Sequence, residues 1–424
     1  MIEISPRNAS RGIQKGTILN QFCCNRKDMK MIYLTFYTRQ KPQQVTFEDL
    51  LNNPFMTLQD LPKEDQKKVT IKVPKEYGLD LMYRRGFYSD SHVYDKIIEN
   101  LVTEEHYRHF RIPKKNNPNK MRKIDAPDDL IGNIQTFYKN FIENSMRVLP
   151  HKAAHAYVEK RSTLTAMQVH QKNESKWFLQ IDLKDFFNSI DGEWLKTMLM
   201  KVYPFPFIEE RIVDNIIKVS LLNGTLPQGS RLSPTLTNIA MIPIDHEITE
   251  KLHNYKRKHF VYTRYADDIT ISCKYKFDPE DIIKNVIKTI FKNFNVPFRI
   301  NEEKTRFGST AGRNYHVGLI LNKDNEISLG HEKNNKFRAM IFNFCTTGDE
   351  WELKDVYRMM GLISYYKSIE PDFVEKVLDK YSIKFNFDIM TKAKNIINGN
   401  PLTSQNGPEP MMNTVNNSVD ELPF

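Results

Sequence analysis

The chain of 424 residues contains 40% hydrophobic and 27% charged residues, a balance that excludes a fibrous or wholly disordered protein. Lys and Arg outnumber Asp and Glu by 62 to 52, and the formal net charge of +10 indicates a polyanionic partner, nucleic acid before an anionic membrane. No apolar run approaches the ~18 residues of a membrane span, and the four cysteines match neither a disulfide framework nor a zinc pattern. These features predict a soluble protein of a reducing compartment.

The first third of the chain is predicted to change from a weakly patterned arm to regular structure. Residues 1–91 are expected to form a basic N-terminal arm and leader without sustained periodicity. Helical spacing of apolar residues begins after residue 92, and a polar turn rich in Lys and Arg then separates two short extended segments. Asp128 follows Pro127 and is placed to cap the next helix.

The rest of the chain alternates between predicted strands and helices before it becomes mostly helical. The apolar segment 176–183 predicts a buried strand that ends in an acidic residue, and the runs around the polar turn within 260–272 predict a β-hairpin. The segment 278–294 has the spacing of an amphipathic helix. Residues 331–385 are predicted to be mostly helical, and 396–424 are rich in Pro, Asn, Gly and Ser, as in a mobile tail.

Two adjacent carboxylates lie at the predicted tip of the hairpin, in the sequence Tyr265-Ala266-Asp267-Asp268. Like charges repel each other, and a divalent metal ion would remove this repulsion. Asp182 ends the buried strand and adds a third carboxylate if the two strands lie side by side. Three carboxylates from two strand ends could hold a pair of Mg²⁺ ions ~3.5–4 Å apart, the spacing used in two-metal phosphoryl transfer.

Each of these carboxylates also has an ordinary structural interpretation. Asp267 and Asp268 fit a solvated polar turn, and Asp182 fits a cap for the segment that follows its strand. Asp185 suits the capping role better than Asp182 does, which leaves Asp182 available for a metal ion. The metal interpretation therefore depends on all three side chains meeting at one place.

The motif blocks of the chain resemble those of bacterial reverse transcriptases, specifically the retron-like and defence-associated groups. The resemblance covers roughly residues 92–385, and its strength lies in the order of the blocks, since any single block is weak evidence. In chain order the blocks are FRIPKK with RKIDAP, HAYVEKRS, LQIDLKDFFNSI, LPQGSRLSP, YADD, NEEKTR and HVGL. The resemblance implies an α+β fold of the right-hand polymerase type, with fingers, a palm built on an antiparallel sheet, and a helical thumb.

The resemblance also implies catalytic roles for individual residues. Asp182, Asp267 and Asp268 match the metal-binding carboxylates of the family, and the backbone carbonyl of Leu183 would face the same metal. The implied cofactor is a pair of Mg²⁺ ions. Lys304 matches a lysine that protonates the leaving pyrophosphate as a general acid, although a solvated surface lysine gives the same pattern.

Other residues are expected to contact the nucleotide and the template–primer. Phe187 matches the steric gate, where a bulky ring clashes with a ribose 2′-hydroxyl and so favours deoxynucleotides; a core aromatic is the alternative. Gly229 could also be an ordinary loop glycine, and Lys114 and Arg122 could be solvated surface charges. The other expected nucleotide-binding residues are Lys114, Arg122, Gln228 and Gly229, and the expected template or primer contacts are Tyr265, Ser230 and Arg231.

The same resemblance divides the chain into five parts and implies its partners. The parts are an N-terminal arm and leader at 1–91, fingers at 92–175, a palm at 176–325, a helical thumb at 326–390 and a flexible tail at 391–424. The implied partners are an RNA template, the cDNA product and dNTPs, in the bacterial cytoplasm and without a membrane. Whether the chain forms a homo-oligomer is left open.

The expected function is that of an RNA-directed DNA polymerase that copies a cognate non-coding RNA in antiphage defence. Retron enzymes carry N-A-x-x-H and V-T-G elements where this chain has Thr165–His170 and His316-Val317-Gly318, which favours a stand-alone enzyme of the defence-associated type. The alternatives are a retron enzyme that makes a branched RNA–DNA hybrid, a non-catalytic RNA-binding scaffold, and a template-independent polymerase. The intact set of three Asp residues argues against a scaffold.

Overall fold

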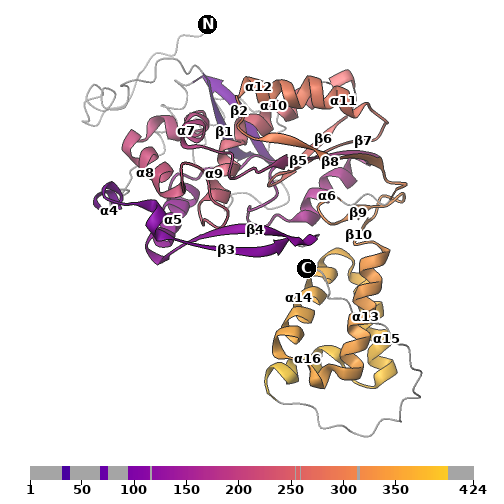
Figure 1. Ribbon diagram of the computed structural model, residues 1–424. Coiled ribbons are helices and arrows are strands. Elements are labelled where there is room, and N and C mark those ends of the chain that lie inside the picture. The colour runs from indigo at the N-terminus through magenta and orange to yellow at the C-terminus, as the bar shows by residue number, and fades with distance from the viewer. Residues whose placement is uncertain are drawn as a thin grey trace, which may run out of the picture.

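The computed structural model describes residues 31–38, 67–74, 94–114, 117–253, 255–257, 259–312 and 316–399. Within them the chain forms a body of helices and antiparallel strands, and a group of C-terminal helices that Figure 1 shows below this body. Residues 1–30 of the predicted leader and the tail beyond residue 399 lie outside the described residues. None of the described helices is both long and apolar enough to cross a membrane.

A four-stranded antiparallel sheet forms the centre of the body, with its strands in the order β6-β7-β5-β8. Every side chain of β7 after its first residue is buried, as expected for an inner strand that is covered on both faces. The hairpin predicted within 260–272 is confirmed as β6–β7. The strands are β5 (Trp177–Lys184), β6 (Val261–Tyr265), β7 (Asp268–Cys273) and β8 (Arg299–Ser309).

Helices of the body share one hydrophobic core with this sheet. The amphipathic segment predicted at 278–294 is confirmed, because α11, η8 and α12 follow one another there and bury their apolar side chains. The helices of the body are α4 (Asp95–Glu99), η4 (Thr103–His106), α5 (Asp129–Asn140), η5 (Phe141–Ser145), α6 (Thr163–Lys172), α7 (Gly192–Leu199), η6 (Phe205–Phe207), α8 (Glu210–Ser220), α9 (Ser233–Ala240), α10 (Ile242–His253), η7 (Tyr255–Arg257), α11 (Pro279–Ile282), η8 (Ile283–Lys288) and α12 (Thr289–Asn293).

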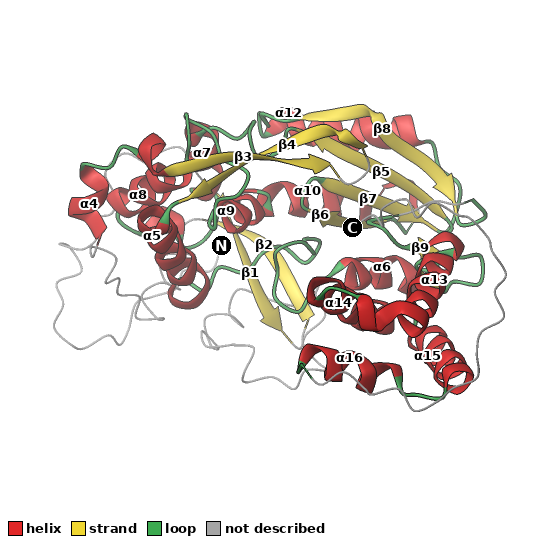
Figure 2. Ribbon diagram, turned by 60° about the horizontal axis from the view of Figure 1, so that its bottom comes forward, coloured by secondary structure: helices red, strands yellow, loops and turns green. Residues whose placement is uncertain are grey.

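A long two-stranded hairpin runs beside the body and leads into α5 (Figure 2). It consists of β3 (Tyr107–Lys114) and β4 (Asn117–Pro127). The predicted cap is confirmed, since the side chain of Asp128 accepts a hydrogen bond from the backbone N–H of Ile131 at 3.0 Å. The other predicted cap is wrong: the side chain of Asp191, not that of Asp185, caps α7.

A second hairpin packs on the body in the region where the sequence predicted an unpatterned arm. It pairs β1 (Met31–Thr38) with β2 (Lys67–Pro74). The Tyr33 backbone N–H donates to the Lys201 carbonyl at 2.8 Å, and the Tyr33 hydroxyl donates to Glu247 of α10 at 2.8 Å. The arm prediction is therefore wrong for these two segments. Strands so far apart in sequence are stabilised by tertiary contacts, which local periodicity does not reveal.

The C-terminal helices enclose a second hydrophobic core, to which α6 and β5 of the body contribute Met167 and Phe178. The predicted tail boundary at 391 is wrong, because it falls inside α16, whose Ile389 and Ala393 are buried. Asp388 caps this helix and extends regular structure to residue 397. The elements are β9 (Ile320–Leu321), β10 (Ile327–Ser328), α13 (His331–Thr347), η9 (Gly348–Glu350), α14 (Leu353–Ile369), α15 (Pro371–Phe385) and α16 (Ile389–Ile397).

Candidate active site

The turn between β6 and β7 presents two carboxylates at one end of the sheet. Tyr265 pairs with Asp268 across the hairpin, so only Ala266 and Asp267 form the turn. Ala266 has a φ of 56°, in the left-handed region that tight two-residue hairpin turns use. The turn therefore places Asp267 and Asp268 at the end of two largely buried strands.

Asp182 lies beside these carboxylates because β5 is the neighbour of β7. Its Cα is the register partner of the Cα of Asp268, and partner side chains share a face, with Cβ atoms ~4.5–5.5 Å apart. The backbone N–H of Leu183 also donates to the carbonyl of Asp267 at 3.1 Å. The structure thus brings together the three carboxylates that the sequence analysis singled out.

Burial and neighbouring negative charge raise the pKa values of the two carboxylates at the turn. Desolvation first, and then the charges of Asp267 and Asp182, raise the pKa of Asp268 to about 6. Desolvation and Asp182 also raise the pKa of Asp267, whereas Lys304 and Arg122 oppose the shift. The site therefore favours the arrival of a cation when all three carboxylates are charged.

Two side chains of β8 contact Asp182 from the other side of the strand. The Lys304 ammonium donates to Asp182 Oδ1 at 2.8 Å, and the Asn301 amide donates to Oδ2 at 3.1 Å. The hydrogen bond to Asp182 raises the pKa of Lys304, so the lysine carries the proton that a general acid needs. Asn301 could not be predicted from the sequence, because an irregularity in the pairing between Gln180 and Asp182 is what aligns it with Asp182.

The donor chemistry of the carboxylates fits a divalent metal ion. Carboxylate oxygens are the ligands that Mg²⁺ prefers, and a cation would offset the repulsion that, after desolvation, helps to raise the two pKa values. Within the part of the chain that the structure describes, no group of three or more His, Cys, Asp or Glu side chains is already arranged to hold an ion. The Asp182 carboxylate is paired with Lys304 instead, so it would exchange this ammonium for a metal ion.

An aromatic pair lies next to the carboxylates. Phe187 is only partly buried, whereas Phe186 beside it belongs to the core. The Phe187 ring meets the exposed ring of Tyr157 edge to face, with centroids 6.3 Å apart. Asp267 is close enough to Tyr157 to raise its pKa, after desolvation. Tyr157 was missed, although it lies within the HAYVEKRS block.

The loop that follows Leu226 is held against β4 through a close backbone approach. Gly229 has a φ of 119°, and a Cβ at this position would lie 2.7 Å from the carbonyl oxygen of Asp125. The backbone N–H of Asp125 in turn donates to the Gln228 carbonyl at 2.7 Å. The contact with β4 alone therefore requires glycine at 229.

The next two residues of this loop also make contacts inside the protein. Ser230 is 5% exposed, and its hydroxyl donates to the Gln135 side chain at 3.1 Å, so it does not have the exposed position that a direct template contact needs. Arg231 is exposed, and its guanidinium donates to the Gly132 carbonyl at 3.2 Å. Both residues anchor the loop to α5.

The remaining predicted contact residues lie around the edge of the same site. Arg122 is exposed on β4 and close enough to Asp267 to affect its pKa. The side chain of Lys114, at the end of β3, lies outside the described residues. Tyr265 ends β6 and is near enough to Tyr365 of α14 to affect its pKa. Tyr365 is a further residue near the site that the sequence did not indicate.

Comparison with known proteins agrees with this geometry. The profile of the family "Reverse transcriptase (RNA-dependent DNA polymerase)" matches residues 112–343. The chain is 31% identical to the retron Ec73 reverse transcriptase of Escherichia coli, over 62% of this chain and 83% of that protein, and 28% identical to retron Ec83 reverse transcriptase of Escherichia coli, over 65% and 87%. Telomerase from Candida Tropicalis matches with a TM-score of 0.42 and 12% identity, over 74% of this chain and 64% of that chain, a likeness too low to carry an argument.

The chain belongs to the reverse transcriptase family, and its relatives place it with the retron-like bacterial enzymes. It has the right-hand polymerase fold, and it is an RNA-directed DNA polymerase with an RNA template as partner. Dependence on a divalent metal ion is a general property of this family and agrees with the clustered carboxylates.

Proposed function

We propose that the enzyme copies a cognate non-coding RNA into cDNA from dNTPs, with Asp182, Asp267 and Asp268 as the ligands of two Mg²⁺ ions. The observation that carries the proposal is the cross-strand pairing of Asp182 with Asp268, beside the turn that holds Asp267. The ions would activate the attacking 3′-hydroxyl and neutralise charge on the leaving pyrophosphate. The proposed location is the cytoplasm of a bacterium, because the curated relatives quoted above are bacterial.

The residues around the carboxylates bind and orient the reactants in this proposal. Lys304, 2.8 Å from Asp182, delivers its proton to the pyrophosphate oxygen as the P–O bond breaks. Arg122 and Lys114 bind the triphosphate from the β3–β4 hairpin, and the Phe187 ring excludes a ribose 2′-hydroxyl. Leu183 offers its backbone carbonyl to the metal. Gln228 and Gly229 contact the incoming nucleotide, and Tyr265 and Arg231 line the path of the template and primer.

The proposed division into fingers, palm and thumb follows the elements of the fold. The fingers begin at 92 and contain β3 and β4, and the palm from 176 contains the four-stranded sheet. The thumb begins at 326 and extends to 397, the end of α16, rather than to 390. The face of α14 that lies toward Tyr265 would then contact the hybrid duplex through phosphates and 2′-hydroxyls.

The metal assignment is tested by the double substitution Asp267→Ala plus Asp268→Ala. We expect primer extension to fall by at least ~10³-fold, because the loss of metal ligands removes several kcal/mol of transition-state stabilisation. RNA binding, measured by filter retention, should change less than about twofold. Glu302→Ala plus Glu303→Ala removes two adjacent exposed acids from β8 and serves as the matched control. Wild-type extension by the first variant would contradict the assignment. If the unmodified enzyme incorporates no dNTP either with or without Mg²⁺, the result would favour a non-catalytic scaffold.

The template and product distinguish the main proposal from the retron alternative. Sequencing of the RNA and cDNA that copurify with the protein is expected to identify one dominant structured RNA, whereas a broad mixture would contradict a dedicated template. The retron relatives favour the alternative in which the product is a branched RNA–DNA hybrid. A 2′–5′ linkage, detected as a mobility shift after treatment with debranching enzyme, would establish that alternative.

The role in antiphage defence is a separate part of the proposal. It is supported by the resemblance of the motif blocks to defence-associated enzymes. Plaque formation should be reduced in cells that carry the enzyme together with the RNA that copurifies with it, and it should be restored by Asp267→Ala plus Asp268→Ala. Equal plaque numbers with the active and inactive enzymes, over a panel of phages, would contradict a defence role that depends on synthesis.

A further inference from the structure

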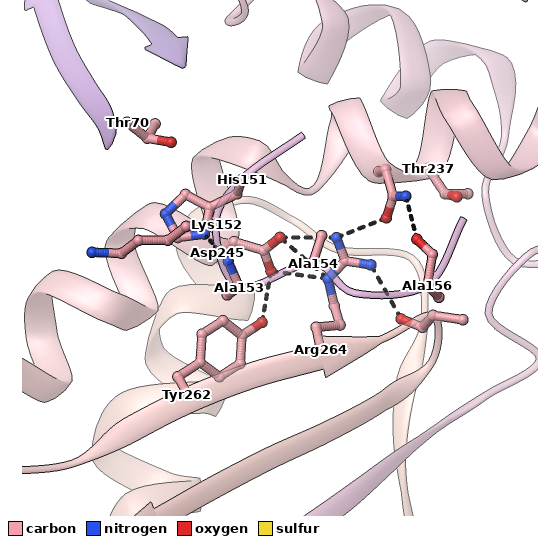
Figure 3. Close-up of polar contacts among 12 residues, drawn as sticks. Thr70, His151, Lys152, Ala153, Ala154, Ala156, Thr237, Asp245, Tyr262 and Arg264 are labelled. Carbon is pink, nitrogen blue, oxygen red and sulfur yellow. Dashed lines mark hydrogen bonds and ion pairs between the residues drawn. The ribbon is translucent and has the colours of Figure 1, made fainter. Parts of the chain in front are cut away.

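A fully buried ion pair lies directly behind the turn that carries Asp267. The side chains of Arg264 in β6 and Asp245 in α10 are 0% exposed. Arg264 Nη2 lies 2.8 Å from Asp245 Oδ2, and Nε lies 2.9 Å from Oδ1, the two-point contact that Figure 3 shows. The Tyr262 hydroxyl donates to the same carboxylate at 2.6 Å. Two side chains of the strand that leads into the turn are thus fixed to one carboxylate of α10.

The third nitrogen of the guanidinium reaches the turn itself. Arg264 Nη1 donates to the carbonyl of Ala266 at 3.2 Å, while Nη2 also donates to Asn238 of α9 at 3.2 Å. Ala266 has a φ of 56°, and for a residue with a Cβ the left-handed region costs roughly 1–2 kcal/mol. A charged donor that satisfies this carbonyl therefore holds the peptide group that immediately precedes Asp267.

The backbone around Arg264 is held as firmly as the side chain. The Arg264 N–H donates to the Ala153 carbonyl at 2.7 Å, and the His155 N–H donates to the Arg264 carbonyl at 2.8 Å. The Asn238 amide, already in contact with the guanidinium, donates to the Ala156 carbonyl at 2.9 Å. Helices α9 and α10 and the segment 153–156 therefore converge on this one residue of β6.

Stability alone does not account for an ion pair at this place. Removing two charges from water costs several kcal/mol per ion, and apolar replacements of buried pairs often leave stability unchanged or increase it. What the pair provides is geometry: the planar fork of Arg264 contacts Asp245, Asn238 and Ala266 at the same time. A lysine offers a single nitrogen and cannot reproduce this arrangement.

We propose that Arg264 is a positioning residue for the polymerase reaction, which fixes the Ala266 peptide and thereby the distance of the Asp267 carboxylate from Asp182. Asp245 orients Arg264 and acts through it. The inference rests on the proposed metal role of the three carboxylates. Arg264 itself is sealed from solvent and touches neither substrate nor metal.

The first test is the substitution Arg264→Lys, which keeps the charge and removes the fork. We expect the Mg²⁺ concentration for half-maximal primer extension to rise about tenfold and kcat to fall about 10–100-fold, because misplacement by ~1 Å costs on the order of 10²-fold in rate. Binding of Mn²⁺, followed through the electron paramagnetic resonance signal of the free ion, should weaken in parallel. Wild-type Mn²⁺ binding and Mg²⁺ response in the folded variant would overturn the proposal.

A second variant and a control separate positioning from general stability. Arg264→Met combined with Asp245→Leu leaves no unpaired buried charge, so it should fold even where Arg264→Lys does not, and it should still bind Mn²⁺ about tenfold more weakly. Wild-type Mn²⁺ affinity in this double variant would also overturn the proposal. Lys392→Met removes a different buried cation, which pairs with Asp349 at 2.8 Å in the C-terminal helices. It should lower the urea midpoint and leave Mn²⁺ binding unchanged.

A benchmark variant distinguishes failure of this inference from failure of the proposed function. Asp268→Ala is expected to weaken Mn²⁺ binding more than Arg264→Lys does, because it removes a proposed ligand. If Asp268→Ala binds Mn²⁺ as the unmodified enzyme does, the metal assignment itself is wrong. If Asp268→Ala weakens binding and both Arg264 variants do not, only the positioning role is wrong.

Discussion

One carboxylate–guanidinium pair and one carboxylate–ammonium pair flank the β6–β7 hairpin, and they differ in their contact with water. Asp245 and Arg264, behind the turn, are both 0% exposed. Asp182 and Lys304, in front of it, are 14% and 62% exposed, with a similar closest approach of 2.8 Å. The distance between charges is therefore the same in the two pairs, and the surroundings differ.

This difference assigns different tasks to the two pairs. A pair without access to water cannot exchange partners, because either ion left alone would remain uncompensated in the interior. A pair whose ammonium is largely hydrated can open at little cost, since surface ion pairs contribute only ~0–1 kcal/mol. Behind the turn the pair fixes a conformation, whereas in front of it the Asp182 carboxylate stays available to another cation.

The largest expected difference between the two pairs follows from removing one carboxylate from each pair. Asp245→Ala is expected to lower the free energy of unfolding by about 3–5 kcal/mol, because Arg264 would be left buried without its counter-charge. Asp182→Ala should change it by less than about 1 kcal/mol, because Lys304 remains hydrated. Urea unfolding followed by circular dichroism measures both. Equal losses in the two variants would show that exposure does not separate the pairs.

The sequence was sufficient to predict the front of the hairpin, because its signals are local. Asp182 lies near the end of an apolar strand, and Asp267 and Asp268 lie in a polar turn between two apolar runs. The order of the blocks then indicated that these strands belong together, and the pairing of β5 with β7 agrees. Local patterns could also identify the cap at Asp128.

The back of the hairpin could not be predicted in the same way, because its contacts join distant segments. Asp245 and Arg264 are ionisable residues inside apolar stretches, which is a signal of burial, but nothing in the sequence pairs them with each other. Asn301 contacts Asp182 only because of an irregularity in the strand pairing. The β1–β2 hairpin and the last helix likewise depend on tertiary packing and on the Asp388 cap.

Acid should destabilise the folded protein through three buried histidines. Burial lowers the pKa of His155, His170 and His316 to about 3, so in the folded state they stay neutral where the unfolded chain binds protons. Stability is therefore retained above about pH 6.5 and lost as the pH falls from there toward 3, at up to ~1.4 kcal/mol per pH unit for each histidine. Urea unfolding between pH 7 and 5 measures this slope.

The contribution of a single histidine can be isolated at His170. Its two ring nitrogens lie 2.7 Å from Ser272 Oγ and 2.8 Å from Thr263 Oγ1, so it joins both strands of the hairpin. His170→Gln should lower stability at pH 7 and make it less dependent on pH. The raised pKa of Asp268 acts in the opposite direction, since it favours the folded state as the pH falls below about 6. An unchanged slope in His170→Gln would show that this residue does not set the acid response.

On the open side, Lys304→Met should affect the reaction more than the fold. Loss of a general acid typically lowers the rate 10²–10⁴-fold. Because water can partly replace an exposed ammonium, we expect a smaller decrease, roughly tenfold to a hundredfold, in the rate of single-turnover primer extension. The urea midpoint should hardly move, because the Lys304 ammonium is mostly hydrated. Lys288→Met, which removes an exposed lysine paired with Glu302, is the control and should leave the rate unchanged. A large loss of stability with an unchanged rate would assign Lys304 to the fold.

The smallest expected effect tests the ring beside the open pair. Phe187 is only partly buried and rests edge to face on Tyr157, so Phe187→Ala removes this ring contact and opens space next to the carboxylates. We expect incorporation of ribonucleotides relative to deoxynucleotides to rise several-fold, on the order of the ~1–3 kcal/mol that one steric contact contributes to discrimination. Phe342→Ala, at an exposed ring of the C-terminal helices, is the matched control. If Phe187 is the steric gate, its removal must allow a ribose 2′-hydroxyl to enter the site. An unchanged dNTP/rNTP ratio would therefore show that Phe187 is only a packing residue.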